Sequence, residues 1–312
     1  MKNLKKLKEA VQRGESKGTI LRKGFQKIRD AIFSGFFLLP FTFPKRNALK
    51  TEERRWRFYH FLRWRYKKVI KNALAQPQKE HLHGERIIWW CWLQGLEEAP
   101  ELIRLCLDSV KKQAKGYEIR VISESNLTDY VELPDYINEK YQKGLITRTH
   151  YSDLIRTDLL VHYGGVWIDS TVFLTGWKED LVQKSSLFAF RTTNAVRAVK
   201  ASSWFIAAVP GDRILSLVRD FLMTYWKTHD RLLDYYLFHL FFSIAADCFP
   251  EEWRNSPNWN NVNPHLLQRE VKKGASAEDC REFLPLAWAH KLTYKLEETD
   301  MMKLIEVVKQ LA

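Results

Sequence analysis

Between residues 86 and 123 the spacing of the apolar residues changes from that of a strand to that of a helix and back to that of a strand. Arg86–Leu93 is a run of β-branched and aromatic residues, which is typical of a buried strand. Pro100 suits a first helical turn, and Gly116 ends a helix whose apolar face carries Leu102, Ile103, Cys106 and Val110. Tyr117–Ser123 then alternates apolar and polar positions as a second strand. Strand, helix and strand in this order predict a parallel pair with a right-handed crossover.

A helix, a turn and a strand are predicted between residues 151 and 174. The pattern predicts a helix from about Ser152 to His162, ended by Gly164 and Gly165, and then a buried strand Val166–Ile168. Asp169 stands where this strand ends. Open α/β sheets place their ligand chemistry at the carboxyl ends of strands. Asp169 is therefore a candidate site residue.

Two further charges belong to this candidate site. Asp153 and Arg156 are three residues apart on the predicted helix and share a face. Two carboxylates and a guanidinium can converge on one cleft, which suits a polar, hydroxyl-rich, phosphate-bearing ligand. The alternative is a surface helix pair worth a few tenths of a kcal/mol.

The glycine pair does not form a known phosphate-binding motif. No GxGxxG fingerprint and no GxxxxGK[ST] loop occurs in the chain. Gly164 and Gly165 also read as a helix C-cap in left-handed geometry, which lets the backbone turn sharply into the strand.

The ordered set resembles a family signature. It reads Ser152-Asp153-Leu154-Ile155-Arg156, then Tyr163-Gly164-Gly165-Val166-Trp167-Ile168-Asp169. This is similar to the nucleotide-sugar site of GT-A-type glycosyltransferases, above all the bacterial capsular polysaccharide synthesis glycosyltransferases of the DXD sugar-binding-region superfamily. The resemblance implies an α/β fold with a GT-A-like, Rossmann-type nucleotide-sugar domain. It also implies that Asp153 and Arg156 bind donor sugar hydroxyls, that Asp169 faces the ribose, sugar and metal region, and that Ser152, Gly164 and Gly165 belong to the donor site.

One position departs from the family pattern. Thr171 stands where the superfamily has the second Asp, so the element reads Asp-Ser-Thr. A buried diphosphate needs compensating positive charge, usually a divalent cation held by oxygen ligands. The resemblance implies Mn²⁺ or Mg²⁺ held by Asp169 and Thr171. A hydroxyl is a weaker ligand than a carboxylate, so Lys or Arg could instead meet part of the phosphate charge.

The first strand is similar to the strand with which these enzymes open their domain. Trp90, Trp92 and Gln94 lie near its end, where the family binds the nucleoside base. Strand alternation sends Trp90 and Trp92 to one face and Trp89 and Cys91 to the other. One aromatic is expected to stack on a uracil-like base; core packing is the alternative for each.

Later segments extend the resemblance to about Lys295. Ser203 and Trp204 belong to a segment similar to the strand that lines the acceptor side of these enzymes. Asp234 and His239 stand in a similar Asp-Tyr-Tyr-Leu-Phe-His stretch. Asp234 is a candidate acceptor base or sugar ligand. His239 is a candidate donor contact, or an interior hydrogen-bonded histidine.

The closing element His290–Lys295 also resembles the family. Lys291 or Lys295 could meet the departing diphosphate with positive charge. Solvated lysines at a strand edge are the alternative.

Charge divides the chain into two predicted parts. Residues 1–80 hold 22 Lys or Arg against 6 Asp or Glu, whereas the remaining 232 hold 28 against 31. The basic part, with the apolar stretch Ala31–Pro44 and the aromatic and basic stretch Trp56–Ala73, predicts a helical extension on an anionic membrane surface. The alternatives are a packed extension with a solvated basic face, and nucleic-acid binding, which we do not expect because no such motif accompanies it. Residues 81–312 are the predicted GT-A-like glycosyltransferase domain.

The cysteines and the N-terminus bear on location. Cys91, Cys106, Cys248 and Cys280 match no zinc or CxxC pattern, and buried free thiols indicate a reducing compartment. No secretory signal is recognisable. We expect a cytoplasmic protein, peripheral on the inner face of the cell membrane.

Together these patterns predict a hexosyltransferase. It would move a sugar from a UDP-linked donor to a lipid-linked or growing capsular polysaccharide, with retention of configuration as in its most similar relatives. The alternative is a non-catalytic, membrane-associated scaffold with a degenerate glycosyltransferase fold, which the missing second Asp favours.

Overall fold

The computed structural model describes residues 48–77, 85–183, 185–192 and 198–312. The chain forms two units, one ending at Phe58 and one running from Tyr59 to Ala312. The first unit is described only as the start of helix α3 (Ala48–Arg65). The apolar stretch Ala31–Pro44 lies outside the described residues.

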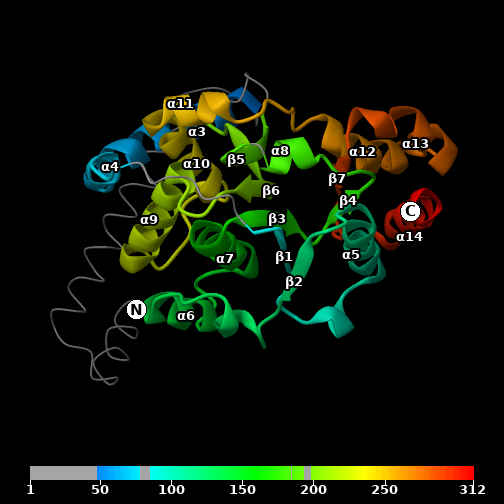
Figure 1. Cartoon of the computed structure of the whole chain (residues 1–312), viewed down its shortest axis with the longest axis horizontal. Coiled ribbons are helices and arrows are strands. Elements are labelled where there is room, and N and C mark those ends of the chain that lie inside the picture. The colour runs from blue at the N-terminus through cyan, green and yellow to red at the C-terminus, as the bar shows by residue number, and fades with distance from the viewer. Residues whose placement is uncertain (1–47, 78–84, 184, 193–197) are drawn as a thin grey trace, which may run out of the picture. The chain divides into compact units, whose positions relative to one another are not determined.

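A five-stranded sheet forms the centre of the second unit (Figure 1). Its strands, in spatial order, are β2 (Glu118–Ile122), β1 (Ile87–Cys91), β3 (Gly165–Asp169), β6 (Ala201–Ala208) and β5 (Leu187–Arg191). β1 is parallel to β2 and β3, whereas β6 is antiparallel to β3 and β5. The predicted parallel pair and the α/β fold class are confirmed. The finer GT-A assignment stays a prediction.

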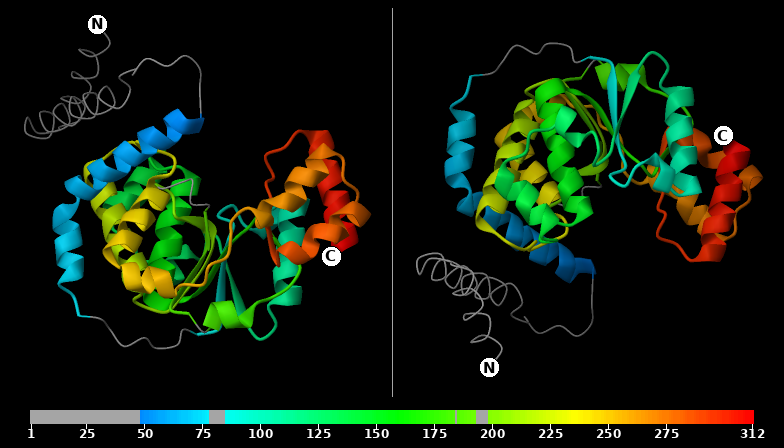
Figure 2. Two further views of the ribbon diagram at one scale, coloured as in Figure 1. Left: turned by 90° about the horizontal axis from the view of Figure 1, so that it is seen from above. Right: turned by 90° about the horizontal axis from the view of Figure 1, so that it is seen from below.

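Helices cover both faces of this sheet. On one face, α7 (Arg148–Tyr163) packs on β3 and β6, α10 (Leu237–Cys248) packs on β6, and α9 (Arg213–Thr228) packs on α7 and α10. On the other face, Ile103 and Val110 of α5 (Glu101–Gln113) share an apolar cluster with Trp90 and Ile168. The two views of Figure 2 show α7, α9 and α10 on one side of the strands and α5 on the other.

A second, two-stranded sheet lies beside α5. Its strands are β4 (Val172–Leu174) and β7 (Ala289–Lys291), which pair antiparallel. The C-terminal helices α12 (Leu266–Lys273), α13 (Ala277–Phe283) and α14 (Glu298–Leu311) form a separate core with Leu102 and Cys106 of α5. The antiparallel pairing brings the closing segment of the chain back to the end of β3.

The remaining short elements connect these layers. They are η1 (Leu96–Glu98), η2 (Leu127–Asp129), α6 (Asp135–Gln142), α8 (Glu179–Gln183), α11 (Pro250–Asn255), η3 (Asn263–His265) and η4 (Leu284–Leu286).

The glycine pair shapes the entry into β3. Gly164 caps α7 with φ 68° and ψ −151°, so φ is positive as expected, but ψ lies outside the left-handed helical region that we predicted. A Cβ on Gly165 would stand 2.6 Å from the Ile87 carbonyl oxygen of β1, and one on Gly164 2.6 Å from Cδ of Pro210. Glycine is required here because backbone and neighbouring side chain leave no room for a Cβ.

The end of the basic segment packs on the folded body. The Tyr66 ring meets Phe221 of α9 and Phe241 of α10 edge-on, and the Tyr59 hydroxyl donates to Asp247. Residues from Tyr59 through α4 (Lys67–Leu74) thus belong to the same unit as the sheet. Among the described residues, no helix combines the length and the apolar character needed to cross a bilayer.

Candidate active site

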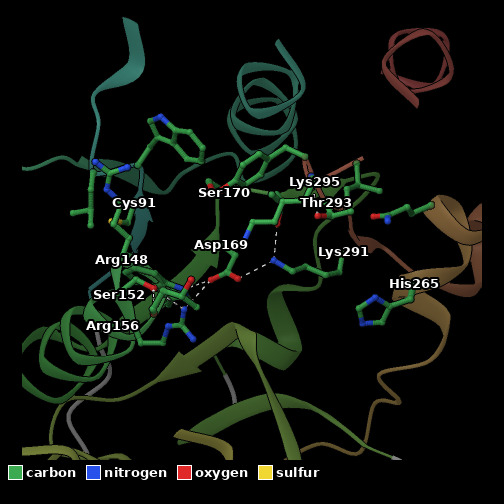
Figure 3. Close-up of a pocket in the computed structure, with 18 of the residues that line it drawn as sticks. Cys91, Arg148, Ser152, Arg156, Asp169, Ser170, His265, Lys291, Thr293 and Lys295 are labelled. Atoms are coloured by element: carbon green, nitrogen blue, oxygen red, sulfur yellow. Dashed lines mark hydrogen bonds and ion pairs between the residues drawn. The ribbon is translucent and has the colours of Figure 1, made fainter. Parts of the chain in front are cut away.

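A cavity of about 700 Å³ opens at the carboxyl ends of β1 and β3 (Figure 3). The segment from the end of β1 contributes Cys91, Trp92, Leu93 and Gln94, and the first turns of α7 contribute Arg148, Thr149, Ser152 and Arg156. β3 and the residues directly after it contribute Trp167 and the segment Asp169–Thr171. The C-terminal part of the chain contributes His265, Gln268, Arg269, Lys272 and the segment Lys291–Lys295, and Tyr235 also lines the cavity. The carboxyl-end location is the one that the strand pattern predicted.

Asp169 stands at the centre of the pocket, between two cations (Figure 3). Its Oδ1 accepts from Nη2 of Arg156 at 3.1 Å and from Nε1 of Trp167 at 2.8 Å, and its Oδ2 accepts from Nζ of Lys291 at 2.8 Å. Burial by itself would raise the pKa of Asp169, but Lys291 and Arg156 outweigh it and lower the pKa to about 2. The carboxylate is therefore ionised at neutral pH, and 23% of the side chain remains exposed to the cavity.

Arg156 is fixed from several sides, and only 4% of its side chain is exposed. Its Nη1 forms an ion pair with Oδ1 of Asp153 at 2.9 Å, one helical turn away, and its Nη2 contacts Asp169. The guanidinium also lies over the ring of Trp167, 5.0 Å from the centroid. The predicted helix pair exists, and it aims Arg156 at the strand end.

Asp153 itself does not line the pocket. It is buried behind Arg156, where its Oδ2 lies 3.2 Å from Nδ1 of His150. Of the three charges expected to line one cleft, Arg156 and Asp169 do so, and Asp153 reaches the pocket only through Arg156.

Lys291 closes the other side of Asp169. The pairing of β7 with β4 sets Lys291 opposite Val172, and the amide of Leu292 donates to the carbonyl of Thr171 at 2.9 Å. Nζ of Lys291 consequently lies 2.5 Å from Oγ1 of Thr171 as well as 2.8 Å from Asp169. One ammonium thus contacts the side-chain oxygens of the first and third positions of the Asp-Ser-Thr element.

The charge of the pocket wall is strongly positive. Six Lys and Arg residues line it against a single carboxylate, that of Asp169; they are Arg148, Arg156, Arg269, Lys272, Lys291 and Lys295. Burial, and then Lys291, lower the pKa of His265, so this ring adds no charge at neutral pH. A cavity with this balance attracts an anion.

Comparison with known proteins shows the family to which the chain belongs. A family model described as "Capsular polysaccharide synthesis protein" matches residues 40–310. The chain belongs to this family. The resemblance to the capsular polysaccharide family that the motifs carried is therefore confirmed, whereas the DXD assignment and a bacterial source stay predictions.

Two individual proteins are similar to this family member. "O-glycosyltransferase braB" of Annulohypoxylon truncatum is 27% identical over 125 residues, which are 37% of this chain and 30% of that protein. The chain thus matches less than a third of that relative's length. The solved structure "PaToxG Glycosyltransferase" is 13% identical, with 83% of this chain and 96% of that chain covered and a TM-score of 0.38. The family match assigns the chain to the capsular polysaccharide synthesis proteins, and the matched relative is described as an O-glycosyltransferase.

The structure of this family member brings several other predicted residues to the pocket. Besides Arg156, Asp169 and Thr171, the predicted residues that line it are Trp92, Gln94, Ser152, Lys291 and Lys295. The ring of Trp92 meets that of Tyr294 at 5.4 Å, so two aromatics stand together in the wall.

The other predicted site residues lie elsewhere. Trp90 shares the predicted face with Trp92 but is fully buried in the core. Gly164 and Gly165 stand at the amino end of β3, opposite to the end that carries Asp169. Ser203 and Trp204 are on β6, where Trp204 stacks on Phe190 at 4.4 Å and donates from Nε1 to Asn261.

Asp234 and His239 also lie outside the pocket wall. Oδ1 of Asp234 accepts from the amide of Tyr236 at 2.8 Å, and His239 stands on α10 with its ring 5.2 Å from that of Tyr236. The residue of this stretch that does line the cavity is Tyr235, whose ring meets His150 edge-on.

Several basic residues of the pocket wall belong to no sequence motif. Arg148 and Ser152 are four apart on one helix, so helix spacing could have revealed Arg148. Arg269 and Lys272 come from α12 and follow Asp169 by 100 and 103 residues. No local pattern marks them, because only the folding of the C-terminal helices brings them to the cavity.

The pocket is a poor fit for the predicted Mn²⁺ or Mg²⁺. Among the described residues, no group of three or more His, Cys, Asp or Glu could hold a metal ion. Asp169 is the single carboxylate of the pocket lining, both its oxygens already accept hydrogen bonds, and Thr171 offers a neutral hydroxyl. The surrounding Lys and Arg further disfavour a dication.

Proposed function

We propose that this protein transfers a sugar from a nucleotide-diphosphate sugar, UDP-linked, to a lipid-linked or growing polysaccharide. The observation that carries the proposal is the basic pocket at the carboxyl ends of β1 and β3, with Asp169 held between Arg156 and Lys291. An aromatic wall, a ring of cations and one ionised carboxylate match the base, the diphosphate and the hydroxyls of such a donor.

The diphosphate accounts for the excess of positive charge. A nucleotide sugar carries two negative phosphates, and removing them from water without partners is costly. Charge-assisted hydrogen bonds from Lys and Arg are about twice as strong as neutral ones. Lys291 is the last residue of β7 and Lys295 lies in the segment that follows it. Arg269 and Lys272 lie on α12.

Asp169 retains the capacity to bind a hydroxyl. An ionised carboxylate offers about four acceptor positions. The three donors described above leave one for a ribose or sugar hydroxyl. Arg156, with almost no exposed surface, mainly orients this carboxylate, and Asp153 orients Arg156 in turn.

The wall near Trp92 suits the nucleoside base. Trp92 follows β1 and Tyr294 follows β7, and their rings meet edge-on. A planar base gains roughly 1–3 kcal/mol by stacking on an aromatic ring. Gln94, also in the wall, has amide groups that can donate to and accept from the base edge.

The transfer itself exchanges one bond for another. The bond between the anomeric carbon and the donor phosphate oxygen breaks, and its electron pair stays on the departing nucleoside diphosphate. An acceptor hydroxyl oxygen bonds to the anomeric carbon, and its proton passes to the departing phosphate oxygen. The cations of the pocket lower the barrier because they stabilise charge that grows on the diphosphate. This proton transfer requires the acceptor and the leaving group to lie on the same face of the sugar. We therefore propose that the configuration at the anomeric carbon is retained.

We also propose that the basic N-terminal segment holds the enzyme on an anionic membrane surface, at the inner face of the cell membrane. The segment combines a large Lys and Arg excess with aromatic residues. Within its described part, Trp64 is 62% exposed and stands beside Phe61, with ring centroids 5.9 Å apart. A membrane-bound acceptor would be concentrated there.

The decisive experiment is a panel of nucleotide sugars offered to the purified full-length protein. We expect UDP-sugars to raise the melting temperature, with slow release of free sugar in the absence of acceptor. Thermal stabilisation without any hydrolysis or transfer would favour the non-catalytic scaffold. Stabilisation by no nucleotide sugar would contradict the donor assignment itself.

A further inference from the structure

The arrangement of Lys291 goes beyond a general basic wall. Its Nζ is within hydrogen-bond distance of Asp169 Oδ2, at 2.8 Å, and of Thr171 Oγ1, at 2.5 Å. These are the first and third side chains of the Asp-Ser-Thr element, the positions that hold the two Asp residues in the family's Asp-X-Asp pattern. A protein ammonium therefore occupies the place between them.

The backbone holds Lys291 in this place. β7 pairs with β4 directly after the Asp-Ser-Thr element, with Lys291 opposite Val172 and His290 opposite Phe173. The Leu292 amide continues the pairing to the Thr171 carbonyl. Because Lys291 lies inside this register, its side chain can leave Asp169 only by rotating.

The oxygens are arranged for an ammonium rather than for a dication. Mg²⁺ and similar ions take close octahedral sets of oxygens at about 2.1 Å and are usually held by one or two carboxylates plus phosphates. Here a single carboxylate is available in the pocket lining, and Arg156 and Lys291 bind its two oxygens. A dication beside Asp169 would meet the Lys291 ammonium at close range, and the two like charges would repel.

We propose that Lys291 takes the role of the divalent cation, so that donor binding and transfer proceed without metal; this rests on the proposed function. An ammonium has three N–H donors. Asp169 and Thr171 accept two of them, and the third is free to bind a phosphate oxygen of the donor. Thr171 then suits this site better than a second Asp would, because its hydroxyl accepts from Lys291 without cancelling the charge that the diphosphate needs.

The leaving group benefits in the same way. As the bond to the anomeric carbon breaks, the electron pair adds charge to the diphosphate next to Lys291. A fixed ammonium stabilises that charge without a metal entering or leaving with the nucleotide. Arg269, Lys272 and Lys295 supply the further positive charge that a diphosphate requires.

The test measures binding of UDP, and of inorganic pyrophosphate as a probe independent of the base, to the full-length protein by calorimetry. We expect the affinity for both to change by less than about twofold between EDTA and MnCl2. Lys291→Met removes the charge at similar length and should weaken both by roughly 10–100-fold. Lys111→Met, at an exposed position of α5, is the matched control and should bind as the wild type does.

A gain-of-function variant sharpens the test. Thr171→Asp combined with Lys291→Ala adds a second carboxylate to that of Asp169 and removes the ammonium. Its UDP affinity should rise roughly tenfold or more when MnCl2 replaces EDTA, and failure to rise would contradict the assignment of Thr171 to the cation position. Thermal melts confirm folding of each variant, and Lys291→Arg, which retains charge, should bind UDP better than Lys291→Met.

Two outcomes separate the inference from the function on which it rests. Wild-type binding of UDP that EDTA abolishes and MnCl2 restores would overturn the role of Lys291 and leave the transferase proposal intact. Absence of UDP and pyrophosphate binding under both conditions would overturn both.

Discussion

Nη2 of Arg156 lies 3.1 Å from Oδ1 of Asp169, although 13 residues of helix, glycine turn and strand separate the two positions. The contact joins the middle of α7 to the end of β3. A second carboxylate, that of Asp153, holds the guanidinium from behind. The carboxylate at the pocket centre therefore has a fixed orientation before any ligand arrives, which is what charge stabilisation in a transition state requires.

Replacing Asp169 by Asn should remove transfer and leave the fold in place. The amide matches the carboxylate in shape but cannot balance Arg156 and Lys291. We expect the transfer rate to fall about a hundredfold or more, with an unchanged far-UV circular dichroism spectrum. Asp108→Asn, at a side chain 69% exposed on α5, is the control and should keep full activity. Near-normal turnover in Asp169→Asn would contradict the role given to Asp169.

Arg156→Lys should also impair transfer, because one ammonium cannot bridge Asp153 and Asp169 as the forked guanidinium does. We expect a loss of roughly 10–100-fold in kcat/KM. Arg254→Lys, at an exposed side chain of α11, provides the control.

A double-mutant cycle tests whether Asp153 acts through Arg156. Asp153→Asn in the Arg156→Lys background should add little to the loss of transfer activity, since the guanidinium that Asp153 positions is already absent. Additive losses would instead indicate that Asp153 contacts the ligand directly.

Gly165→Ala should strongly destabilise the protein. The new Cβ would lie 2.6 Å from the Ile87 carbonyl oxygen, and Gly165 has φ 88°. Gly144→Ala is a matched control, with φ 67° but no atom within 4 Å of the new Cβ. We expect roughly 1–2 kcal/mol for Gly144→Ala, from backbone strain alone, and a clearly larger loss for Gly165→Ala in urea unfolding. Equal losses would show that β1 moves aside at no cost.

Asp212 should make stability depend on pH. The side chain is 1% exposed and accepts from the amide of Leu215 at the start of α9. Burial raises its pKa to about 7, although the amides of Leu215 and Ile214 act in the opposite direction. Above pH 4 the unfolded chain loses this proton while the folded chain keeps it, so stability falls as the pH rises from about 4 to about 7.

Asp212→Asn isolates this effect, because Asn caps helices as well as Asp but does not ionise. Relative to the wild type, the variant should gain roughly 2–4 kcal/mol in free energy of unfolding between pH 4 and pH 7. Parallel stability curves for the two proteins across this range would refute the raised pKa.

Deletion of residues 1–47 should reduce flotation with anionic vesicles while the melting temperature of the body is retained. Deletion of residues 1–80 should also destabilise the body, because it removes Tyr66 from Phe221 and Phe241. Vesicles of neutral lipid and high salt are the controls, since the attraction is electrostatic. Salt-sensitive binding to RNA or DNA in preference to vesicles would contradict the membrane proposal.

The sequence by itself determined the local features of the site. Apolar period and glycine positions predicted the strand–helix–strand pair, the helix that carries Arg156, and the strand that ends at Asp169, because these patterns depend on neighbours a few residues apart. The family resemblance to capsular polysaccharide synthesis proteins came mainly from the motif Ser152–Asp169 and from shorter similar segments up to about Lys295.

Only the tertiary structure decided what surrounds Asp169. Lys291 follows it by 122 residues and is placed by the pairing of β4 with β7, and Arg269 reaches the pocket from α12. The same folding leaves Trp90 in the core and Asp153 behind Arg156, although the chain pattern placed both at the site. Electrostatics and packing act between residues that are close in space whatever their separation along the chain, so a local pattern does not contain them.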